Sequence, residues 1–255
     1  MSVPELDCDT LARRFVDDDT LALLLVGSYA RGEACRSSDI DLARHVAADV
    51  EHGAIVCSID EAGRMVTVKT LCAARQAAAL TDPGAAVWQV PTLRDAVILF
   101  DRDGTAAGLI DRARTFSWDD LSEAADRHVA AEVAAYAEEA LKISGGLAAG
   151  RPGQIVYGVM GLVLGLADVM AVHRRVFVTS ENRVFDIALE AMSDRPAWCD
   201  AFRRAVGYDN AGPRARGRAA LTLYDETVSL VDDLFAADQR AVADIALRAA
   251  TKAGR

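Results

Sequence analysis

The sequence is poor in the residues that build disulfide frameworks and metal clusters. Its 255 residues include four histidines, and no CxxC pair occurs. An odd number of scattered cysteines predicts neither a disulfide framework nor a zinc site. Free thiols persist in a reducing compartment, so we expect a cytoplasmic protein. The five cysteines are Cys8, Cys35, Cys57, Cys72 and Cys199.

The chain also lacks an excess of positive charge, because its formal net charge is −10. Hydrophobic residues make up 52% and charged residues 26%, which is typical of a globular protein. A protein that grips a long nucleic-acid backbone needs a basic face to displace counterions, so we expect no nucleic-acid partner. A site for one nucleotide remains compatible, because a metal ion can screen its phosphates.

Membrane and export signals are weak. Residues 1–19 are acidic and have no basic flank before an apolar run, so we expect no signal peptide. The run IVYGVMGLVLGLADVMAV, residues 155–172, is long enough to span a bilayer, but glycine or aspartate interrupts it at four positions. We therefore predict a buried central helix and no membrane partner.

The first half of the chain mixes strands with short helices. Residues 10–17 predict a helix, and the apolar run LALLLV, 21–26, predicts a strand buried on both faces. Further strands are expected at 39–46, at 54–60 and 64–70 as a hairpin, and at 96–100, followed by a turn at Gly104.

The character of the chain changes after residue 117. Apolar residues recur at helical spacing from Leu121 to Ala140, and this helix is expected to end at Gly145. The apolar helix, the segment ENRVFDIALEAM and a stretch from about 215 to 249 continue the helical pattern. We predict an α+β protein: an α/β domain with a short mixed sheet over 1–112, then a helical bundle domain over 113–255.

The segment GSYARGEACRSSDID, residues 27–41, follows the first apolar strand. On a strand, side chains at i and i+2 point to one face, so Asp39 and Asp41 project together. Two carboxylates on one face suit Mg²⁺ that also binds substrate phosphates. Backbone N–H groups at Gly27 and Ser28, where the strand gives way to a turn, can receive phosphate oxygens. Arg31, one turn further on, can add positive charge.

These residues resemble a known signature. Gly27-Ser28, Arg31 and Ser38-Asp39-Ile40-Asp41 are similar to the signature of the nucleotidyltransferase superfamily that includes DNA polymerase β. With its helical second half, the chain resembles the antibiotic-modifying branch, the aminoglycoside and lincosamide nucleotidyltransferases. The similarity of motifs covers about residues 21–104.

The resemblance implies transfer of a nucleoside monophosphate from a nucleoside triphosphate, ATP by family habit, to an acceptor hydroxyl. Gly27, Ser28, Arg31 and Ser38 would bind the nucleotide, and Asp39 and Asp41 would hold Mg²⁺. The metal would stabilise charge on the α-phosphate and on the departing pyrophosphate.

The chain departs from the family pattern at one position. The family usually has a third carboxylate on the next central strand, whereas RMVTVKT, residues 64–70, contains no acid. Met65, Thr67 and Lys69 are expected to share one face of that strand. Either the general base comes from elsewhere, the register differs, or the protein does not catalyse. The other acids nearby, Asp60 with Glu61 and Asp101 with Asp103, read as turn residues.

The helical half offers other candidates for the base. Glu132 and Glu139 fall on one edge of the apolar stripe, with His128 beside them. An edge position can face an interdomain cleft, where partial burial raises the pKa of a carboxylate toward that of a useful base. We take Glu132 first and Glu139 second; the alternative is a solvated flank with a His128–Glu132 pair.

Two further features carry open alternatives. Asp168 aligns at helical spacing with Tyr157 and Arg175, which predicts a buried ion pair or a polar pocket; the functional alternative is contact with a cationic acceptor. The local basic stretch could contact a triphosphate or be solvated. It consists of Arg203, Arg204, Arg214, Arg216 and Arg218.

Three functions follow, in order. The first is an ATP- and Mg²⁺-dependent nucleotidyltransferase acting on a small hydroxylated molecule, such as an aminoglycoside or lincosamide antibiotic, and an acidic surface would suit a cationic acceptor. The second is a weakly active or inactive nucleotide-binding regulatory protein with the same fold. The third is an enzyme that modifies a protein, although such transferases are usually short single domains.

Overall fold

The computed structural model describes residues 6–49 and 55–253 and divides the chain into two compact units, residues 1–120 and 121–255. The boundary predicted after residue 112 falls within α5 (Thr105–Thr115), whereas the first unit runs on to Asp120.

Unit 1 is built on a five-stranded mixed sheet of order β3-β4-β2-β1-β5. β2 pairs antiparallel with β1 and parallel with β4, and the remaining neighbours are antiparallel. The α+β class and the predicted strands are confirmed; Ala54, the first residue of one predicted strand, lies outside the described residues. The strands are β1 (Thr20–Val26), β2 (Ile40–Val46), β3 (Ile55–Ile59), β4 (Met65–Cys72) and β5 (Val97–Asp101).

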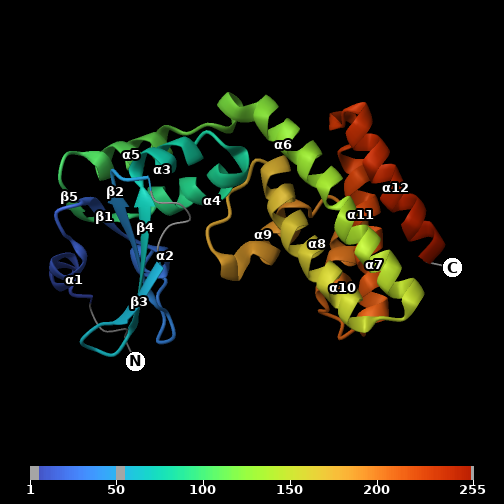
Figure 1. Cartoon of the computed structure of the whole chain (residues 1–255), viewed down its shortest axis with the longest axis horizontal. Coiled ribbons are helices and arrows are strands. Elements are labelled where there is room, and N and C mark those ends of the chain that lie inside the picture. Colours follow the sequence, from blue (N-terminus) through green and yellow to red (C-terminus); the bar gives the residue numbers. More distant parts are fainter. Residues whose placement is uncertain (1–5, 50–54, 254–255) are drawn as a thin grey trace. The chain divides into compact units, whose positions relative to one another are not determined.

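Helices cover the two faces of this sheet differently (Figure 1). On one face, Leu11 of α1 packs with Leu23, Ile40 and Val66 in an apolar core. On the other face, α3 contacts β4, and α5 contacts β1 and β5. The alternation of strand side chains thus places buried residues on both faces. The helices of unit 1 are α1 (Cys8–Phe15), α2 (Gly27–Ala30), α3 (Ala73–Ala79), α4 (Pro83–Arg94) and α5; α3 and α4 were not predicted, although the capping residue Asp82 and Pro83 mark the start of α4.

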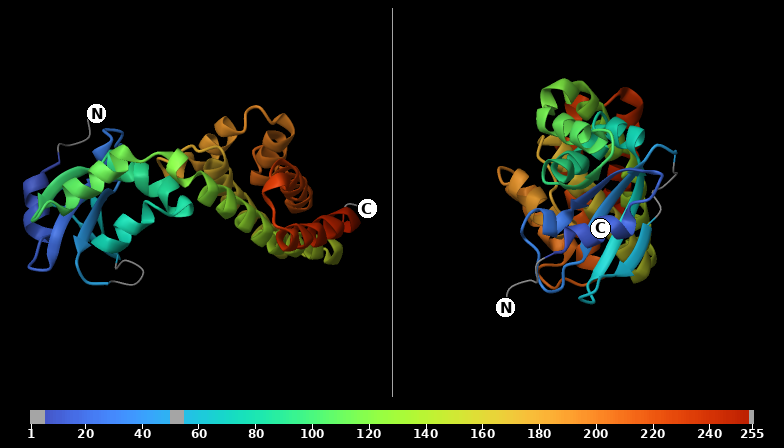
Figure 2. Two further views of the ribbon diagram at one scale, coloured as in Figure 1. Left: turned by 90° about the horizontal axis from the view of Figure 1, so that it is seen from above. Right: turned by 90° about the vertical axis from the view of Figure 1, so that its left-hand side faces the viewer.

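Unit 2 is a bundle in which α7 packs on α8 and α12, and α11 packs on α8 and α10 (Figures 1 and 2). Three short 3₁₀ helices accompany it: η1 (Trp118–Leu121) at the junction, η2 (Glu181–Arg183) and η3 (Asp232–Leu234). The α-helices are α6 (Ser122–Ala135), α7 (Ala137–Ala149), α8 (Pro152–His173), α9 (Val184–Ala191), α10 (Pro196–Val206), α11 (Pro213–Leu230) and α12 (Ala237–Ala253).

The helix expected to end at Gly145 is different in the structure. It breaks at Tyr136 into α6 and α7, and α7 continues through Gly145 to Ala149. A left-handed residue at Gly150 ends it instead. Glycine inside α7 serves packing, because a Cβ on Gly146 would lie 2.9 Å from Ile155 Cγ1. The periodicity was therefore correct, and the stop signal was misread.

The apolar helix α8 lies at the centre of unit 2. Among the described residues it is the one helix long and apolar enough to cross a bilayer, but 67% of its apolar window is buried inside the protein. Glycines let its neighbour approach closely: a Cβ on Gly158 would lie 2.8 Å from Ile143 Cγ1 of α7. The prediction of a buried central helix is confirmed.

A buried histidine in β2 makes unit 1 sensitive to acid. His45 is fully buried, and neither ring nitrogen has a hydrogen-bond partner among the described residues. Burial disfavours the charged form and lowers the pKa of His45 from 6.5 to about 4. The unfolded chain therefore binds a proton below pH 6.5 that the folded chain accepts only below about pH 4.

We predict that this histidine removes roughly 2–3 kcal/mol from the free energy of unfolding as the pH falls from 7.5 to 4.5. The measurement is urea unfolding of the wild type and His45→Leu at both pH values. Burial also lowers the pKa of His173 in unit 2, so the comparison with the variant isolates His45. An identical pH dependence in both proteins would contradict the prediction.

Candidate active site

The loop between β1 and β2 brings the predicted cradle to the predicted carboxylates. Val26, the last residue of β1, pairs with Asp41, the second residue of β2. Ile40 between the two aspartates is fully buried, so Asp39 and Asp41 turn to the opposite face of the sheet. The i, i+2 prediction for the carboxylates therefore matches the strand.

Gly27 makes the closest approach in this region. Its φ is +70°, and a Cβ added to it would lie 2.5 Å from Asp41 Oδ2. A side chain here would be strained by the backbone and would also collide with the carboxylate. The backbone of the Gly27-Ser28 turn thus lies directly beside Asp41, as a joint site for phosphate and metal requires.

Arg31 and Ser38 both make contacts within the loop. Arg31 Nε donates to Glu33 Oε2 at 2.8 Å, and the Arg31 side chain is 15% exposed. The Cys35 N–H donates to Ser38 Oγ at 2.9 Å, which closes the turn before Asp39. These contacts shape the loop, and the nucleotide-binding roles of both residues stay predictions.

The sequence did not single out the thiol in this loop. Hydrogen bonds to Ser37 and then to Ser38 lower the pKa of Cys35 to about 7. The signal was the serine pair that follows Arg36, since neighbouring hydroxyl groups stabilise a thiolate.

Thr67 lies where the third carboxylate was expected. β2 and β4 are parallel, with Asp41 opposite Thr67, and Val66 and Val68 are buried on the far face. The Thr67 hydroxyl donates to Asp39 Oδ2 at 3.4 Å, a long contact. The register is the one predicted, so a shifted strand does not explain the missing acid.

The donor set suits a hard cation that also binds a ligand. Across residues 6–49 and 55–253, no group of three or more His, Cys, Asp or Glu side chains is placed to hold a metal. Two carboxylates leave most positions around Mg²⁺ to water and substrate phosphates, which is how this ion usually binds. Asp39 and Asp41 therefore fit Mg²⁺ as partial ligands.

Three of the acids that were expected at turns, Asp60, Asp101 and Asp103, lie at a turn or at a helix end. Asp60 accepts from the backbone N–H groups of Ala62 and Arg64. Asp101 accepts from the N–H groups of Ala106 and Ala107 at the start of α5, and Asp103 accepts from Thr105. Their local role explains them.

Glu132 and Glu139 lie close to Tyr136 in unit 2. Burial, and then the charges of Glu132, Asp168 and Glu139, raise the pKa of Tyr136. Lys142 donates to Glu139 Oε1 at 2.7 Å, whereas Glu139 Oε2 is buried and accepts no hydrogen bond from the described residues. Glu132 is half-buried, and its role as the general base stays a prediction.

Arg175, which aligns with Asp168 in the sequence, pairs with an acid of another helix, and the polar surroundings of Asp168 stay a prediction. Arg175 Nη2 lies 2.5 Å from Asp126 Oδ1 of α6. The reason is that Arg175 has a left-handed backbone beyond the end of α8, with φ of 57°, so helical spacing does not apply there.

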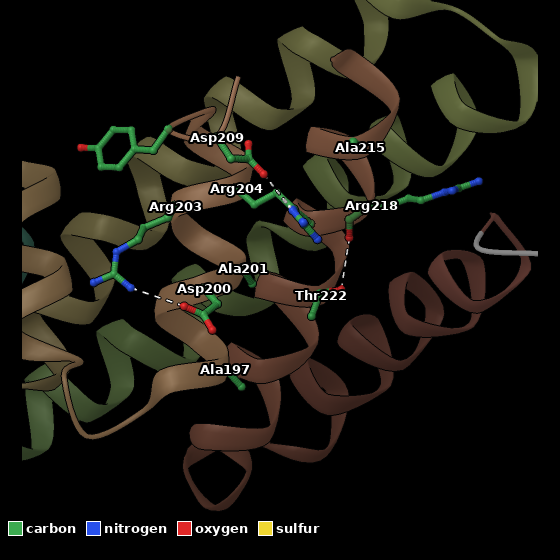
Figure 3. Close-up of a pocket in the computed structure, with 11 residues that line it drawn as sticks. Ala197, Asp200, Ala201, Arg203, Arg204, Asp209, Ala215, Arg218 and Thr222 are labelled. Atoms are coloured by element: carbon green, nitrogen blue, oxygen red, sulfur yellow. Dashed lines mark hydrogen bonds and ion pairs between the residues drawn. The ribbon is translucent and has the colours of Figure 1, made fainter. Parts of the chain in front are cut away.

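The basic stretch of unit 2 borders an open groove of about 820 Å³ between α10 and α11 (Figure 3). Arg203 lies 3.5 Å from Asp200, and Arg204 lies 3.0 Å from Asp209. Since neighbouring aspartates balance two of its arginines, the groove is a weak site for a triphosphate.

Comparison with known proteins agrees with this geometry. Residues 8–70 match the profile of the nucleotidyltransferase domain family. The chain is also similar in fold to a nucleotidyltransferase-like protein from Exiguobacterium sibiricum, with a TM-score of 0.52 and 12% sequence identity over 88% of this chain and 73% of that one. No functionally curated protein matches the sequence. Residues 8–70 therefore resemble a nucleotidyltransferase domain, and the predicted resemblance to this superfamily is confirmed; the antibiotic-modifying branch stays a prediction.

We predict that Gly27→Ala destabilises unit 1 more than Gly63→Ala does. Both glycines have a positive φ, +70° and +77°, but a Cβ on Gly63 meets no atom within 4 Å. In both variants the left-handed backbone costs alanine about 1–2 kcal/mol of the free energy of unfolding. Only at Gly27 does the new Cβ also collide with Asp41. Urea unfolding of the two variants measures the difference, and equal losses would mean that the Asp41 contact does not constrain Gly27.

Proposed function

We propose that this protein transfers a nucleoside monophosphate, AMP from ATP, to a hydroxyl group of a small molecule in the cytoplasm. The observation that carries the proposal is the approach of the Gly27 backbone to the Asp41 carboxylate within a nucleotidyltransferase domain. It supports one site in which a triphosphate and a divalent cation are held together. The resemblance to the antibiotic-modifying branch supports an aminoglycoside or lincosamide antibiotic as the acceptor, which would make the reaction one of antibiotic resistance, whereas the strand surface beyond Asp41 supports an anionic acceptor.

In the proposed reaction the acceptor oxygen bonds to the α-phosphorus and the bond from that phosphorus to the bridging oxygen breaks. Pyrophosphate leaves, and the hydroxyl proton passes to a base. Backbone N–H groups of Gly27 and Ser28, with the Ser28 hydroxyl, hold the triphosphate, and Arg31 and Ser38 support that loop. Asp39 and Asp41 would hold Mg²⁺, which would supply charge stabilisation at the reacting phosphate.

The base is proposed to be Glu132, with Glu139 second. Thr67 has no carboxylate that could accept the proton. Glu132 is a half-buried acid, and its charge adds to burial in raising the pKa of Tyr136. Glu139 is a weaker choice because Lys142 already bonds one of its oxygens.

Thr67 also favours a second candidate function. A chain with a hydroxyl in place of the third acid can bind a nucleotide without turning it over. Such a regulatory protein would bind ATP and Mg²⁺ but show no transfer to any acceptor. Incubation with α-labelled ATP, Mg²⁺ and a panel of hydroxylated acceptors separates the two functions.

Asp39→Asn and Asp41→Asn should each reduce Mg²⁺-dependent transfer by about 100-fold or more, because a metal contributes several kcal/mol of charge stabilisation. Calorimetry should show weaker Mg²⁺-dependent binding of the triphosphate, with little change in urea unfolding. Asp95→Asn is the control, since Asp95 is an exposed aspartate of the same unit. Wild-type turnover in either active-site variant would refute the assignment of the metal.

Glu132→Gln should lower kcat by about 10²–10⁴-fold and leave the affinity for ATP unchanged, because the change removes basicity and keeps size. Glu123→Gln serves as the matched control on α6, where the Glu123 side chain is 93% exposed. If Glu132→Gln keeps the wild-type kcat, Glu132 is not the base, and Glu139→Gln becomes the variant to measure.

A further inference from the structure

The order of the strands indicates on which side of Asp39 and Asp41 each substrate of the proposed reaction binds. β2 carries Asp41 and lies between β1, which ends at Val26 just before Gly27, and β4, beyond which lies β3. In phosphoryl transfer the attacking and leaving oxygens lie roughly in line, on opposite sides of the phosphorus. If pyrophosphate leaves on the Gly27 side, as the proposed function has it, the acceptor approaches over β4 and β3.

The register defines the surface on that side. Asp41 lies opposite Thr67, which lies opposite Cys57, and directly opposed residues share a face of the sheet. The neighbouring pairs on the same face are Lys69 with Ile55 and Met65 with Ile59. We call the six residues Ile55, Cys57, Ile59, Met65, Thr67 and Lys69 the acceptor face.

Most of the acceptor face is apolar and open to solvent. Ile55, Ile59 and Met65 are 61%, 66% and 49% exposed, whereas Val66 and Val68 on the far side of β4 are buried. Apolar side chains gathered beside a polar site mark a surface that binds a ligand or a partner. They would contact an apolar part of the acceptor.

Lys69 gives the acceptor face its charge. It is exposed, it lies two residues beyond Thr67, and within the described residues no carboxylate pairs with it. Strand geometry puts its Cα roughly 8 Å from that of Asp41. Among the described residues of β2, β3 and β4 whose side chains share this face, Lys69 is the one positively charged residue.

A second copy of the chain is a poorer occupant for this surface. Edge strands pair with other strands when their backbone groups are free. Here Arg14 of α1 donates to the Ile59 carbonyl oxygen at 2.5 Å and also bonds Ser58 Oγ, so one end of the β3 edge is already occupied.

We propose that the acceptor is a hydroxylated amphiphile whose apolar part lies on Ile55, Ile59 and Met65 and whose anionic group pairs with Lys69. A carboxylate, sulfonate or phosphate would serve, because each presents a negative oxygen to the ammonium group. A polycation would meet apolar side chains and the like charge of Lys69, while the Mg²⁺ that Asp39 and Asp41 would hold offsets their negative charge. The acceptor class is therefore anionic and partly apolar, and an aminoglycoside does not fit this face.

The test uses three ligands with the same phenol ring and different charge: 4-hydroxyphenylacetate, its neutral amide, and tyramine. Binding is followed by NMR of ¹³C-labelled methionine methyl groups in the full chain, which has five methionines. Met65→Leu assigns the Met65 signal. Each ligand is titrated into the wild type, Lys69→Glu and Lys252→Glu, the last being an exposed lysine of α12 that matches the charge change.

We expect the Met65 signal to shift with 4-hydroxyphenylacetate and its amide, with the acid binding about fivefold or more tightly than tyramine. Lys69→Glu should reverse the order of acid and tyramine, and Lys252→Glu should leave it unchanged. A Met65 signal that no ligand shifts, equal binding of acid and tyramine, or a shift that follows protein concentration instead of ligand would each overturn the proposal.

The binding experiment and the transfer assay test the acceptor face and the proposed function independently. The titrations contain no nucleotide, so selective binding at Met65 without any labelled transfer would refute the proposed function and leave the binding face in place. Transfer to a polycation with an unshifted Met65 signal would refute the acceptor class and leave the transferase in place.

Discussion

The contact between the Gly27 backbone and the Asp41 carboxylate constrains the candidate site more than any other feature. It exists because β1 and β2 are antiparallel neighbours, so the end of one strand meets the start of the other. Only a residue without a Cβ fits there, since a Cβ would lie 2.5 Å from Asp41 Oδ2. The loop from Gly27 to Ser38 must therefore leave the strand, turn, and return within a few residues, and the bonds of Arg31 to Glu33 and of Cys35 to Ser38 hold that path.

Thr67 limits what the aspartate pair can do. It lies opposite Asp41 and touches Asp39 through a long hydroxyl contact. A hydroxyl contributes neither the charge of a third metal ligand nor the basicity of a carboxylate at neutral pH. Most of the rate in phosphoryl transfer comes from positioning and charge stabilisation, so a site with two carboxylates keeps the larger part of the chemistry. What it lacks is proton removal, which must come from another residue or from an acceptor that ionises easily.

The features that follow from the two-residue alternation of strand side chains could be predicted from the sequence. The β1 run from Leu21 to Val26 and the i, i+2 aspartates follow from alternation alone, and the register of Thr67 and Lys69 follows from the same rule. Helix stops were less predictable: Gly145 has the signature of a C-terminal cap but lies inside α7, because packing against α8 favours small residues there. Arg175 and Asp126, 49 residues apart in the chain, form a pair that no local pattern could reveal. The two serines that follow Arg36 are visible in the sequence, but the turn that brings them to Cys35 and lowers its pKa depends on loop geometry.

The net charge of −10 and the single lysine of the acceptor face point to opposite acceptors. Net charge acts over distance, and at physiological ionic strength the field of exposed charges falls off within about 8 Å. It can raise the encounter rate of a cation anywhere on the surface without selecting where that cation binds. Lys69 and its apolar neighbours act at contact range, where desolvation strengthens a charge pair and excludes a like charge. In the proposed reaction, selection of the acceptor would therefore be a property of the few residues around Thr67, whereas the acidic surface elsewhere would affect solubility and encounter rates.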